Sequence, residues 1–216
     1  SWSIPPGIMS CFALTGWTMR NPVAVGQRVY LRPIEERDAE ALARSSVQES
    51  ETAFAEAGRV PVSVMAFQHW IRQINEDTSG REITFSICRI GDDACIGTAT
   101  LRQIDRLHRT AETGSGLLAA DDRGQGLGTE AKHLLLRFAF ESLGLHAISS
   151  IVYSGNARSI AALRKQGYRL AGRLTADVHR GGRFRDVLLF DLLRHEWEAA
   201  YAGMVDERDQ DGAARS

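Results

Sequence analysis

Residues 114–143 read GSGLLAADDRGQGLGTEAKHLLLRFAFESL, and this stretch decides the fold. An extended segment leads into a turn with glycines at 124, 126 and 128, which an apolar-faced helix from Thr129 to Leu143 follows. Glycine lets backbone N–H groups approach a ligand without a Cβ in the way, and a helix start is the positive end of the helix dipole. The stretch predicts a cradle for an anion such as a pyrophosphate, although a turn that only caps a core helix would have the same pattern.

Two common nucleotide-binding motifs are absent from this stretch. No Gly-Lys-Ser/Thr follows the glycines, as a P-loop requires, and their spacing is not the G-x-G-x-x-G of a dinucleotide fold. Any phosphate-bearing ligand is therefore expected to be held in another way.

Strands and helices are predicted on both sides of the glycine turn. We expect strands at Arg28–Arg32, Ile83–Cys88, Cys95–Arg102, Ala111–Ala119, Ala147–Tyr153, Tyr168–Leu174 and Asp186–Leu193. Besides the helix at Thr129–Leu143, we expect helices at Ala39–Val47, Ser63–Ile74 and Ala157–Gln166. A loop at Val178–Phe184 is expected to join the last two strands.

The chain is long enough for one domain, which we place at residues 25–202. Residues 1–24 are apolar without periodicity and are predicted to be a loosely attached leader, either translated from an upstream start or added; a packed arm or dimer contact is the alternative. Residues 203–216 are polar, and we expect a mobile tail there.

Composition narrows the function classes. Lys and Arg number 26 against 27 Asp and Glu, so no globally basic surface for nucleic acid is expected. The apolar stretches are too short to span a bilayer. The three cysteines and six histidines lack the spacing of a zinc site or a disulfide framework. We therefore expect no metal, no nucleic acid, no membrane association, and a reducing, cytoplasmic setting.

The segment Arg123–Gly128 matches the Arg/Gln-x-x-Gly-x-Gly/Ala signature of the GNAT superfamily of N-acetyltransferases. Asn156–Ser159 and Leu163–Tyr168 resemble the Asn-x-x-Ser and Gly-Phe/Tyr block of its branch of ribosomal-protein N-terminal acetyltransferases. Segments from the first strand to the end of the domain also resemble that branch, so the resemblance covers about Val25 to Ala200.

The resemblance implies an α/β (α+β) fold with a mixed, mostly antiparallel, seven-stranded sheet and helices on both faces. Its fourth and fifth strands would splay apart to form a cleft for acetyl-CoA. The fourth strand would pair with the pantetheine arm through backbone groups of Leu117, Leu118 and Ala119. The pyrophosphate would be held by Arg123, Gly124, Gln125, Gly126, Leu127, Gly128 and Thr129. Asn156 would bond the arm, cap the next helix, or do both.

Two residues are candidates for proton transfer. By resemblance, Glu112 faces the acceptor pocket and would accept the proton of the amine, unless it is only a solvated strand carboxylate. Many relatives carry a Tyr where this chain has Leu163, which cannot donate a proton. Ser159 is the substitute that the branch suggests, because a hydroxyl can stabilise a leaving thiolate; the alternative is an exposed helical serine.

Acceptor specificity is expected from the early helices and from the last hairpin. The candidates are His69, Trp70, His179, Arg183 and Phe184, each of which could also be an ordinary surface or packing residue. Glu49, Glu51 and Glu56 could add a modest acidic group.

The function predicted on these grounds is acetyl-CoA-dependent N-acetyl transfer by direct attack in a ternary complex. No covalent intermediate is expected, because neither Cys88 nor Cys95 has a His-based motif beside it. The expected acceptor is a protein or peptide N-terminal amine, and a homodimer is a family-level expectation. The alternatives are a small-molecule amine such as an aminoglycoside-type antibiotic and, in another class, a non-catalytic acyl-CoA-binding or sensing module.

Overall fold

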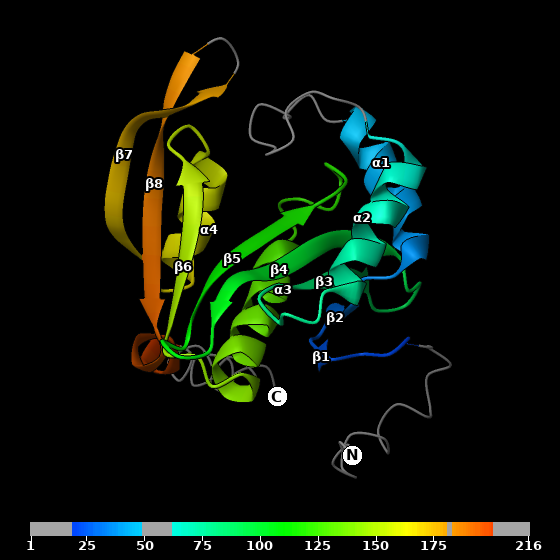
Figure 1. Cartoon of the computed structure of the whole chain (residues 1–216), viewed down its shortest axis with the longest axis horizontal. Coiled ribbons are helices and arrows are strands. Elements are labelled where there is room, and N and C mark those ends of the chain that lie inside the picture. Colours follow the sequence, from blue (N-terminus) through cyan, green and yellow to red (C-terminus); the bar gives the residue numbers. More distant parts are fainter. Residues whose placement is uncertain (1–18, 49–61, 181–182, 201–216) are drawn as a thin grey trace, which may run out of the picture.

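The structure, a computed structural model, describes residues 19–48, 62–180 and 183–200 (Figure 1). Its strands are β1 (Ala24–Val25), β2 (Val29–Pro33), β3 (Ile83–Arg89), β4 (Cys95–Asp105), β5 (Thr110–Leu117), β6 (Ala147–Tyr153), β7 (Arg169–Arg180) and β8 (Arg183–Leu193). Its helices are α1 (Ala39–Gln48), α2 (Val64–Glu76), α3 (Leu127–Arg137) and α4 (Ala157–Lys165). A 3-10 turn precedes α1 at Glu36–Asp38, a π-helical turn extends α3 at Phe138–Ser142, and residues 194–200 are helical.

The strands form one mixed sheet in the order β1-β2-β3-β4-β5-β6-β8-β7, which confirms the predicted fold class. The sheet has eight strands among the described residues, not seven, because Ala24 and Val25 pair with Leu31 and Tyr30. Two residues are too few to show a strand periodicity in the sequence. The predicted start of the domain at residue 25 falls inside this strand. The predicted leader and tail cannot be compared in full, because residues 1–18 and 203–216 lie outside the described residues.

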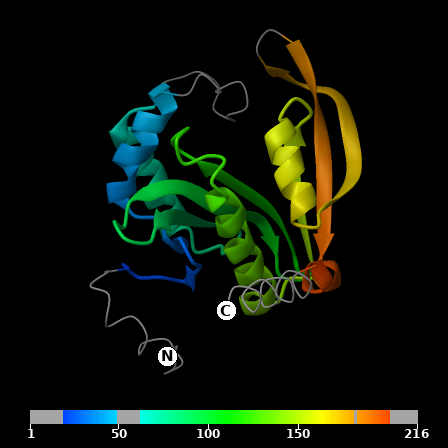
Figure 2. The same cartoon turned by 180° about the vertical axis from the view of Figure 1, so that it is seen from behind.

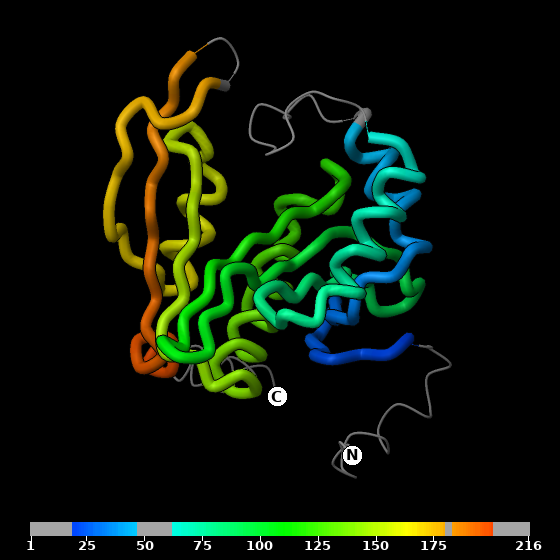
Figure 3. Tube along the Cα trace, in the orientation of Figure 1, coloured from blue at the N-terminus to red at the C-terminus, as the bar shows by residue number. Residues whose placement is uncertain are grey.

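The sheet opens between β5 and β6, the strands that the family pattern counts as fourth and fifth. They pair in parallel only from Thr110 to Glu112, opposite Ala147 to Ser149, and then separate (Figure 3). Beyond the last backbone pair, side chains join the strands: Thr113 Oγ1 donates to Ser149 O at 3.2 Å, and Ser150 Oγ donates to Thr113 O at 3.1 Å. The predicted splay is confirmed, and we call this short contact the seam.

Helices cover both faces of the sheet, as the two opposite views show (Figures 1 and 2). The face with α3 buries the main core, in which Leu134, Leu135 and Phe140 of the helical segment pack against β-strand residues. The opposite face carries α1 and α2 over a smaller cluster that includes Ile34 and Ile71. Within the described ranges, no helix is long and apolar enough to cross a membrane.

The last hairpin is longer than predicted, and the expected loop at Val178–Phe184 is wrong. Val178 pairs with Arg185, and His179 pairs with Phe184, so the strands continue almost to the turn. The ladder shifts register between Leu174 and Val178, where Ala176 has a positive φ of 51° and donates its N–H to Asp186 Oδ1 at 2.8 Å. This bulge interrupts the alternation that marks a strand, so the sequence pattern alone predicts that the strand ends before Val178.

Candidate active site

The glycine turn runs into α3 through two left-handed residues. Gly124 has φ 78°, and Gly126, the N-cap of α3, has φ 80°. A Cβ on Gly124 would meet nothing within 4 Å, whereas one on Gly126 would lie 3.2 Å from Arg28 Nη2. Backbone conformation therefore requires glycine at both positions, and space is also short at Gly126. The helix begins at Leu127, two residues before the predicted start.

The backbone N–H groups of the turn are available to a ligand. The first helical hydrogen bond runs from Glu130 N to Gly126 O, at 3.0 Å. Within the described ranges, no protein group accepts a hydrogen bond from the N–H groups of residues 124–129. A row of free donors at a helix N-terminus suits an anion, so the turn fits a pyrophosphate.

Arg28 and Glu130 hold the turn from the side of β1 and β2. Arg28 Nη1 donates to Gln125 O at 2.7 Å, and Arg28 Nε pairs with Glu130 Oε2 at 3.1 Å. Glu130 Oε1 also accepts the backbone N–H groups of Gln27 at 2.6 Å and Arg28 at 2.8 Å. One carboxylate in the first turn of α3 thus joins the helix to the β1–β2 connection. We call Arg28, Gln125 and Glu130 the clamp.

A second ion pair holds the start of the turn. Asp122 is buried, and its Oδ1 pairs with Arg89 Nη2 of β3 at 2.5 Å. The Gln125 side chain donates to Asp121 O at 2.7 Å. The cradle is therefore fixed at both ends before any ligand binds, which lowers the entropic cost of binding.

The free edge of β5 lies beside the splay. Leu118 N donates to Ile96 O of β4 at 2.9 Å, and Leu118 O accepts Ser45 Oγ at 3.2 Å. Since backbone groups alternate in direction along a strand, Ser115 and Leu117 direct theirs to the open side, where Arg123 Nη2 donates to Leu117 O at 3.2 Å. Leu117 fits the predicted pantetheine edge, Leu118 offers it neither backbone group, and Ala119 lies exposed beyond the strand.

Glu112 lies at the base of the splay, on the last parallel pair with Ser149. It is buried, which excludes a solvated strand carboxylate, and it faces Arg102 directly across the β4–β5 ladder. Arg102 Nε and Nη2 both donate to Glu112 Oε1, at 2.9 and 2.5 Å. Glu112 Oε2 has no hydrogen-bond partner among the described residues, so it can accept a proton.

The strand surface next to Glu112 is bare. Gly114 and Gly116 follow at alternate positions and share its face of the sheet. A Cβ on either glycine would meet nothing within 4 Å. A substrate group can thus reach the β5 backbone beside the carboxylate.

A polar network lies under the seam on the α3 side. The Tyr168 hydroxyl is buried 2.9 Å from Thr113 Oγ1, and Lys132 Nζ lies 5.7 Å from the centre of the Tyr168 ring. Burial raises the pKa of Tyr168 well above its ordinary value, so this hydroxyl stays protonated. This buried position is that of a packing residue.

Asn156 and Ser159 lie at the start of α4, on the other side of the splay. Asn156 Oδ1 accepts Ser159 N at 3.1 Å, so Asn156 caps the helix as predicted. Ser159 is half-buried, and its hydroxyl has no partner in the described part of the chain. Leu163, in the place of the family's Tyr, is buried in the main core.

The predicted acceptor residues fall into two separate groups. His69 and Trp70 are exposed on α2, where the Trp70 ring lies edge-on to Phe67 with centroids 6.2 Å apart. His179 and Phe184 are an exposed cross-strand ring pair on the β7–β8 hairpin, 5.2 Å between centroids, and Arg183 lies beside them. The structure places these groups on opposite flanks of the splay without bringing them together (Figure 1). Glu49, Glu51 and Glu56 lie outside the described residues.

Six contributors to the site were not predicted from the sequence: Arg28, Arg89, Arg102, Thr113, Asp122 and Glu130. Arg102 had no usable signal, because counting back from the turn of the β4–β5 hairpin places Gln103 opposite Glu112, and only the register shift between Arg102 and Asp105 brings Arg102 there. Arg28 and Glu130 are about a hundred residues apart, so only the assembled fold brings them together. Thr113 has the form of any strand threonine in the sequence.

Comparisons with known proteins agree with this geometry. Residues 28–169 match the family model "Acetyltransferase (GNAT) domain". The chain is 28% identical to "Putative ribosomal N-acetyltransferase YdaF" of Bacillus subtilis, over 81% of this chain and 96% of the relative. It is 31% identical to "Probable N-acetyltransferase YjcK" of the same organism, over 80% of this chain and 98% of the relative.

Solved structures share the fold. Mycobacterium smegmatis RimJ in complex with CoA-disulfide superposes with a TM-score of 0.71 at 25% identity, over 83% of this chain and 95% of that one. The spermidine N-acetyltransferase of Vibrio cholerae in complex with CoA and spermine gives a TM-score of 0.71 at 21% identity, over 78% and 97%. The glycine cradle, the splayed strands and the family match together show that the chain is an N-acetyltransferase that belongs to the GNAT family.

Proposed function

We propose that the chain transfers the acetyl group of acetyl-CoA to the N-terminal amine of a protein or peptide. The observation that supports acetyl transfer is the free Oε2 oxygen of Glu112 at the base of the splay. The glycine cradle lies at the near end of α3, so one molecule could have its phosphates there and its thioester beside Glu112. Similarity to a ribosomal N-acetyltransferase and to RimJ supports the acceptor class.

Two residues of the chain would act in the reaction, one on the proton of the amine and one on the departing sulfur. An ammonium group cannot attack an acyl carbon until it loses a proton, and Glu112 Oε2 is placed to accept that proton directly or through water. Arg102 fixes the carboxylate through Oε1 and leaves Oε2 free. The thioester supplies an activated acetyl group, and the Ser159 hydroxyl would donate a hydrogen bond to the departing sulfur.

Charge pairing on the acceptor side disfavours a polyamine. A polycation needs carboxylates that are not already neutralised by the protein. Five described carboxylates of the 3-10 turn with its N-cap, of α1 and of β5 each pair with an arginine. The pairs are Glu35 with Arg20 and Arg37, Glu36 with Arg72, Asp38 with Arg32, Glu40 with Arg44, and Glu112 with Arg102. In the last hairpin, Asp186 pairs with Arg173 and Asp191 with Arg169, whereas Asp177 has no arginine partner among the described residues. An acceptor with a single amine fits these surroundings better.

An acceptor panel tests the proposal. Thiol release from acetyl-CoA would be measured with peptides that have a free N-terminus, the same peptides blocked at that position, spermidine, and an aminoglycoside. We expect turnover with the free peptides alone. Faster turnover with spermidine or the aminoglycoside would assign a small-molecule acceptor instead, and CoA binding without turnover on any acceptor would contradict the proposed transfer.

The Glu112→Gln variant tests the proposed base. An amide cannot accept the proton, so kcat with the best acceptor should fall about a hundredfold with little change in the KM for acetyl-CoA. Glu141→Gln is the matched control, because Glu141 is exposed at the far end of the α3 segment. Equal kcat values for the two variants would remove Glu112 from the mechanism.

The Ser159→Ala variant tests the proposed donor. Loss of one hydrogen bond to a developing thiolate should lower kcat about tenfold, and the deficit should shrink with acyl donors whose thiol leaves more easily. Ser142→Ala provides the comparison, because Ser142 is exposed beyond α3. A deficit that does not depend on the leaving thiol would mean that Ser159 acts only on helix structure.

A further inference from the structure

The β3–β4 hairpin places two cysteines directly opposite each other. Cys88 and Cys95 are partners in the antiparallel register, next to an irregularity between Ile87 and Cys88. Opposite residues of such a pair have Cα atoms about 4.5–5.5 Å apart and direct their side chains to the same face. A disulfide spans Cα distances of about 4.4–6.8 Å, so the backbone spacing allows a bond.

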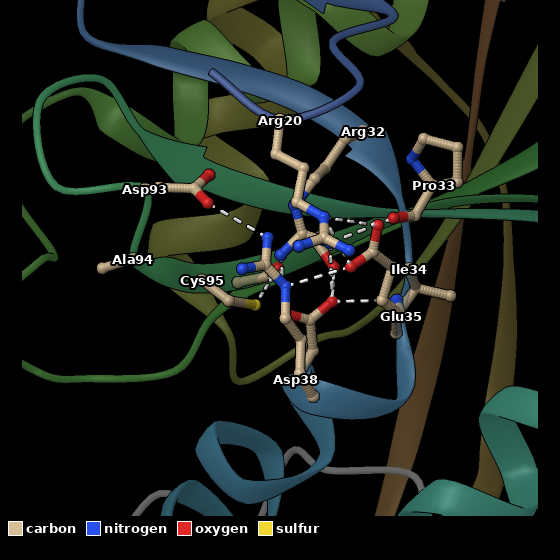
Figure 4. Close-up of polar contacts among 12 residues, drawn as sticks. Arg20, Arg32, Pro33, Ile34, Glu35, Asp38, Asp93, Ala94 and Cys95 are labelled. Carbon is tan, nitrogen blue, oxygen red and sulfur yellow. Dashed lines mark hydrogen bonds and ion pairs between the residues drawn. The ribbon is translucent and has the colours of Figure 1, made fainter. Parts of the chain in front are cut away.

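A buried ion pair lies on the face of the sheet to which Ser86, two residues before Cys88, directs its hydroxyl. Arg32 Nη2 pairs with Asp38 Oδ1 at 2.7 Å, and Ser86 Oγ donates to Asp38 Oδ2 at 2.6 Å (Figure 4). Because alternate residues of a strand share a face, Cys88 lies on the same face as Ser86, and the charges of Arg32 and Asp38 act on the pKa of both cysteines. Figure 4 shows Cys95 beside the ion pair.

The two thiols differ in access. Cys88 is fully buried, whereas Cys95 is partly exposed near the end of the hairpin. A small reagent can therefore reach Cys95 first, and Cys88 is placed as the second, resolving thiol. This order is the one that a two-step disulfide exchange requires.

We propose that Cys88 and Cys95 form a cross-strand disulfide when the protein meets a small-molecule disulfide such as oxidised glutathione. The Cys95 thiolate attacks the reagent, forms a mixed disulfide and releases one thiol. The Cys88 thiolate then attacks Cys95 Sγ and releases the second thiol. The protein loses two protons and two electrons, and the reagent disulfide is reduced to two thiols.

The proposed bond has a defined place in the fold. It lies one residue from Arg89, whose ion pair with Asp122 holds the start of the glycine turn. Burial raises the pKa of Cys95 and raises that of Cys88 to about 12, against the effect of Arg32 on both. Because the thiolate is the attacking species, we expect the reaction to be slow at neutral pH and faster in mild alkali.

Mass spectrometry of the full chain tests the proposal. The Cys11→Ser variant would be treated with oxidised glutathione in mild alkali, unfolded in the presence of a maleimide, and digested with trypsin. Cleavage after Arg81, Arg89 and Arg102 separates the cysteines, so the disulfide would link peptide 82–89 to peptide 90–102. We expect to detect this disulfide-linked pair of peptides with no maleimide on either cysteine, and we expect the pair to disappear after reduction.

Two outcomes would overturn the proposal. One is full maleimide labelling of both cysteines after the treatment. The other is a lasting glutathione adduct on Cys95 while Cys88 stays a free thiol. The Cys88→Ser variant serves as the control and should stop at that adduct, and the wild-type chain provides the same linked peptides if a variant does not fold.

Discussion

Lys132 is a buried amine in the middle of α3 and one of only two lysines in the chain. It lies over the Tyr168 ring, where a cation interacts favourably with the aromatic face. Burial lowers its pKa from 10.5 to about 7, the charge of Glu112 acts in the opposite direction, and the charge of Arg102 lowers the pKa further. Near neutral pH, a charge on this amine is therefore costly to the fold.

The pH dependence of stability follows from this lowered pKa. In the unfolded chain, Lys132 keeps its proton up to about pH 10, so between about pH 7 and 10 the unfolded state binds more protons and stability rises with pH. Below about pH 7 both states are protonated and the full cost remains. We expect Lys132→Met to raise the free energy of unfolding by about 2 kcal/mol in weak acid and by less in mild alkali.

Urea unfolding of the wild type and variant at both pH values measures this difference. Lys165→Met is the matched control, because Lys165 is exposed and its replacement should leave the pH dependence unchanged. An identical pH slope for wild type and Lys132→Met would show that Lys132 does not titrate in this range.

At the scale of the element, the clamp makes the glycine turn rigid before it meets a phosphate. Glu130 belongs to the first turn of α3, yet it bonds the connection between β1 and β2. A carboxylate there also stabilises the positive end of the helix. The clamp thus combines a favourable helix start with a fixed position of the turn.

The Glu130→Gln variant tests whether the clamp positions the cofactor. The amide retains an acceptor oxygen for the backbone N–H groups but loses the ion pair with Arg28. We expect the KM for acetyl-CoA to rise about fivefold, which corresponds to about 1 kcal/mol, while kcat changes little. Glu141→Gln, exposed at the far end of the same helical segment, should leave both constants unchanged. A fall in kcat at an unchanged KM would contradict a positioning role.

Elements were predictable where one local pattern governs them. The strand, glycine turn and helix from residue 114 to 143 have consistent periodicity and turn chemistry, so their order was correct. The helix start was two residues late, because Leu127 and Gly128 read as turn residues until Gly126 is seen as the N-cap. The β7–β8 hairpin was cut short, because the bulge at Ala176 depends on Asp186 across the ladder.

At the scale of the whole molecule, the seam holds two parts of the sheet together. Thr113 Oγ1 contacts both Ser149 O and the Tyr168 hydroxyl, immediately after the last backbone pair. We expect the width of the splay to depend on these side-chain bonds. They therefore connect packing on the α3 side with the opening in which the thioester is proposed to lie.

The Thr113→Val variant removes the hydroxyl while it keeps the shape of the side chain. The buried Tyr168 hydroxyl then loses its partner, so we expect a loss of about 1–2 kcal/mol in the free energy of unfolding. A looser seam should also raise the KM for acetyl-CoA severalfold. Thr100→Val is the control, because Thr100, which lies opposite Gly114, bonds Thr84 of β3 rather than a group of the seam.

Unfolding curves and steady-state kinetics on both variants provide the measurement. A similar KM in Thr113→Val and Thr100→Val would show that the seam does not set the opening. A KM effect confined to Thr113→Val would support it.

The family resemblance supplied the global topology, since strand order and splay are not encoded in any single segment. The extra strand β1 was not predicted because two residues are too few to show a strand periodicity, and the arginine partner of Glu112 was not predicted because a register shift in the hairpin decides which residue faces it. The resemblance predicted that Glu112 faces the acceptor pocket. The burial of Glu112 and its single free oxygen are seen only in the folded structure. Local chemistry was thus predictable, and its surroundings were not.

The seam also makes the molecule mechanically uneven. β5 and β6 share three paired positions, whereas β6 and β8 share seven. A force applied between the exposed side chains of Leu107 and Phe184 would act across this short backbone contact and across the main core, to which both parts of the sheet contribute. When the molecule is stretched in an optical trap, the β5–β6 pairing should separate first, while the strands on either side of it remain folded.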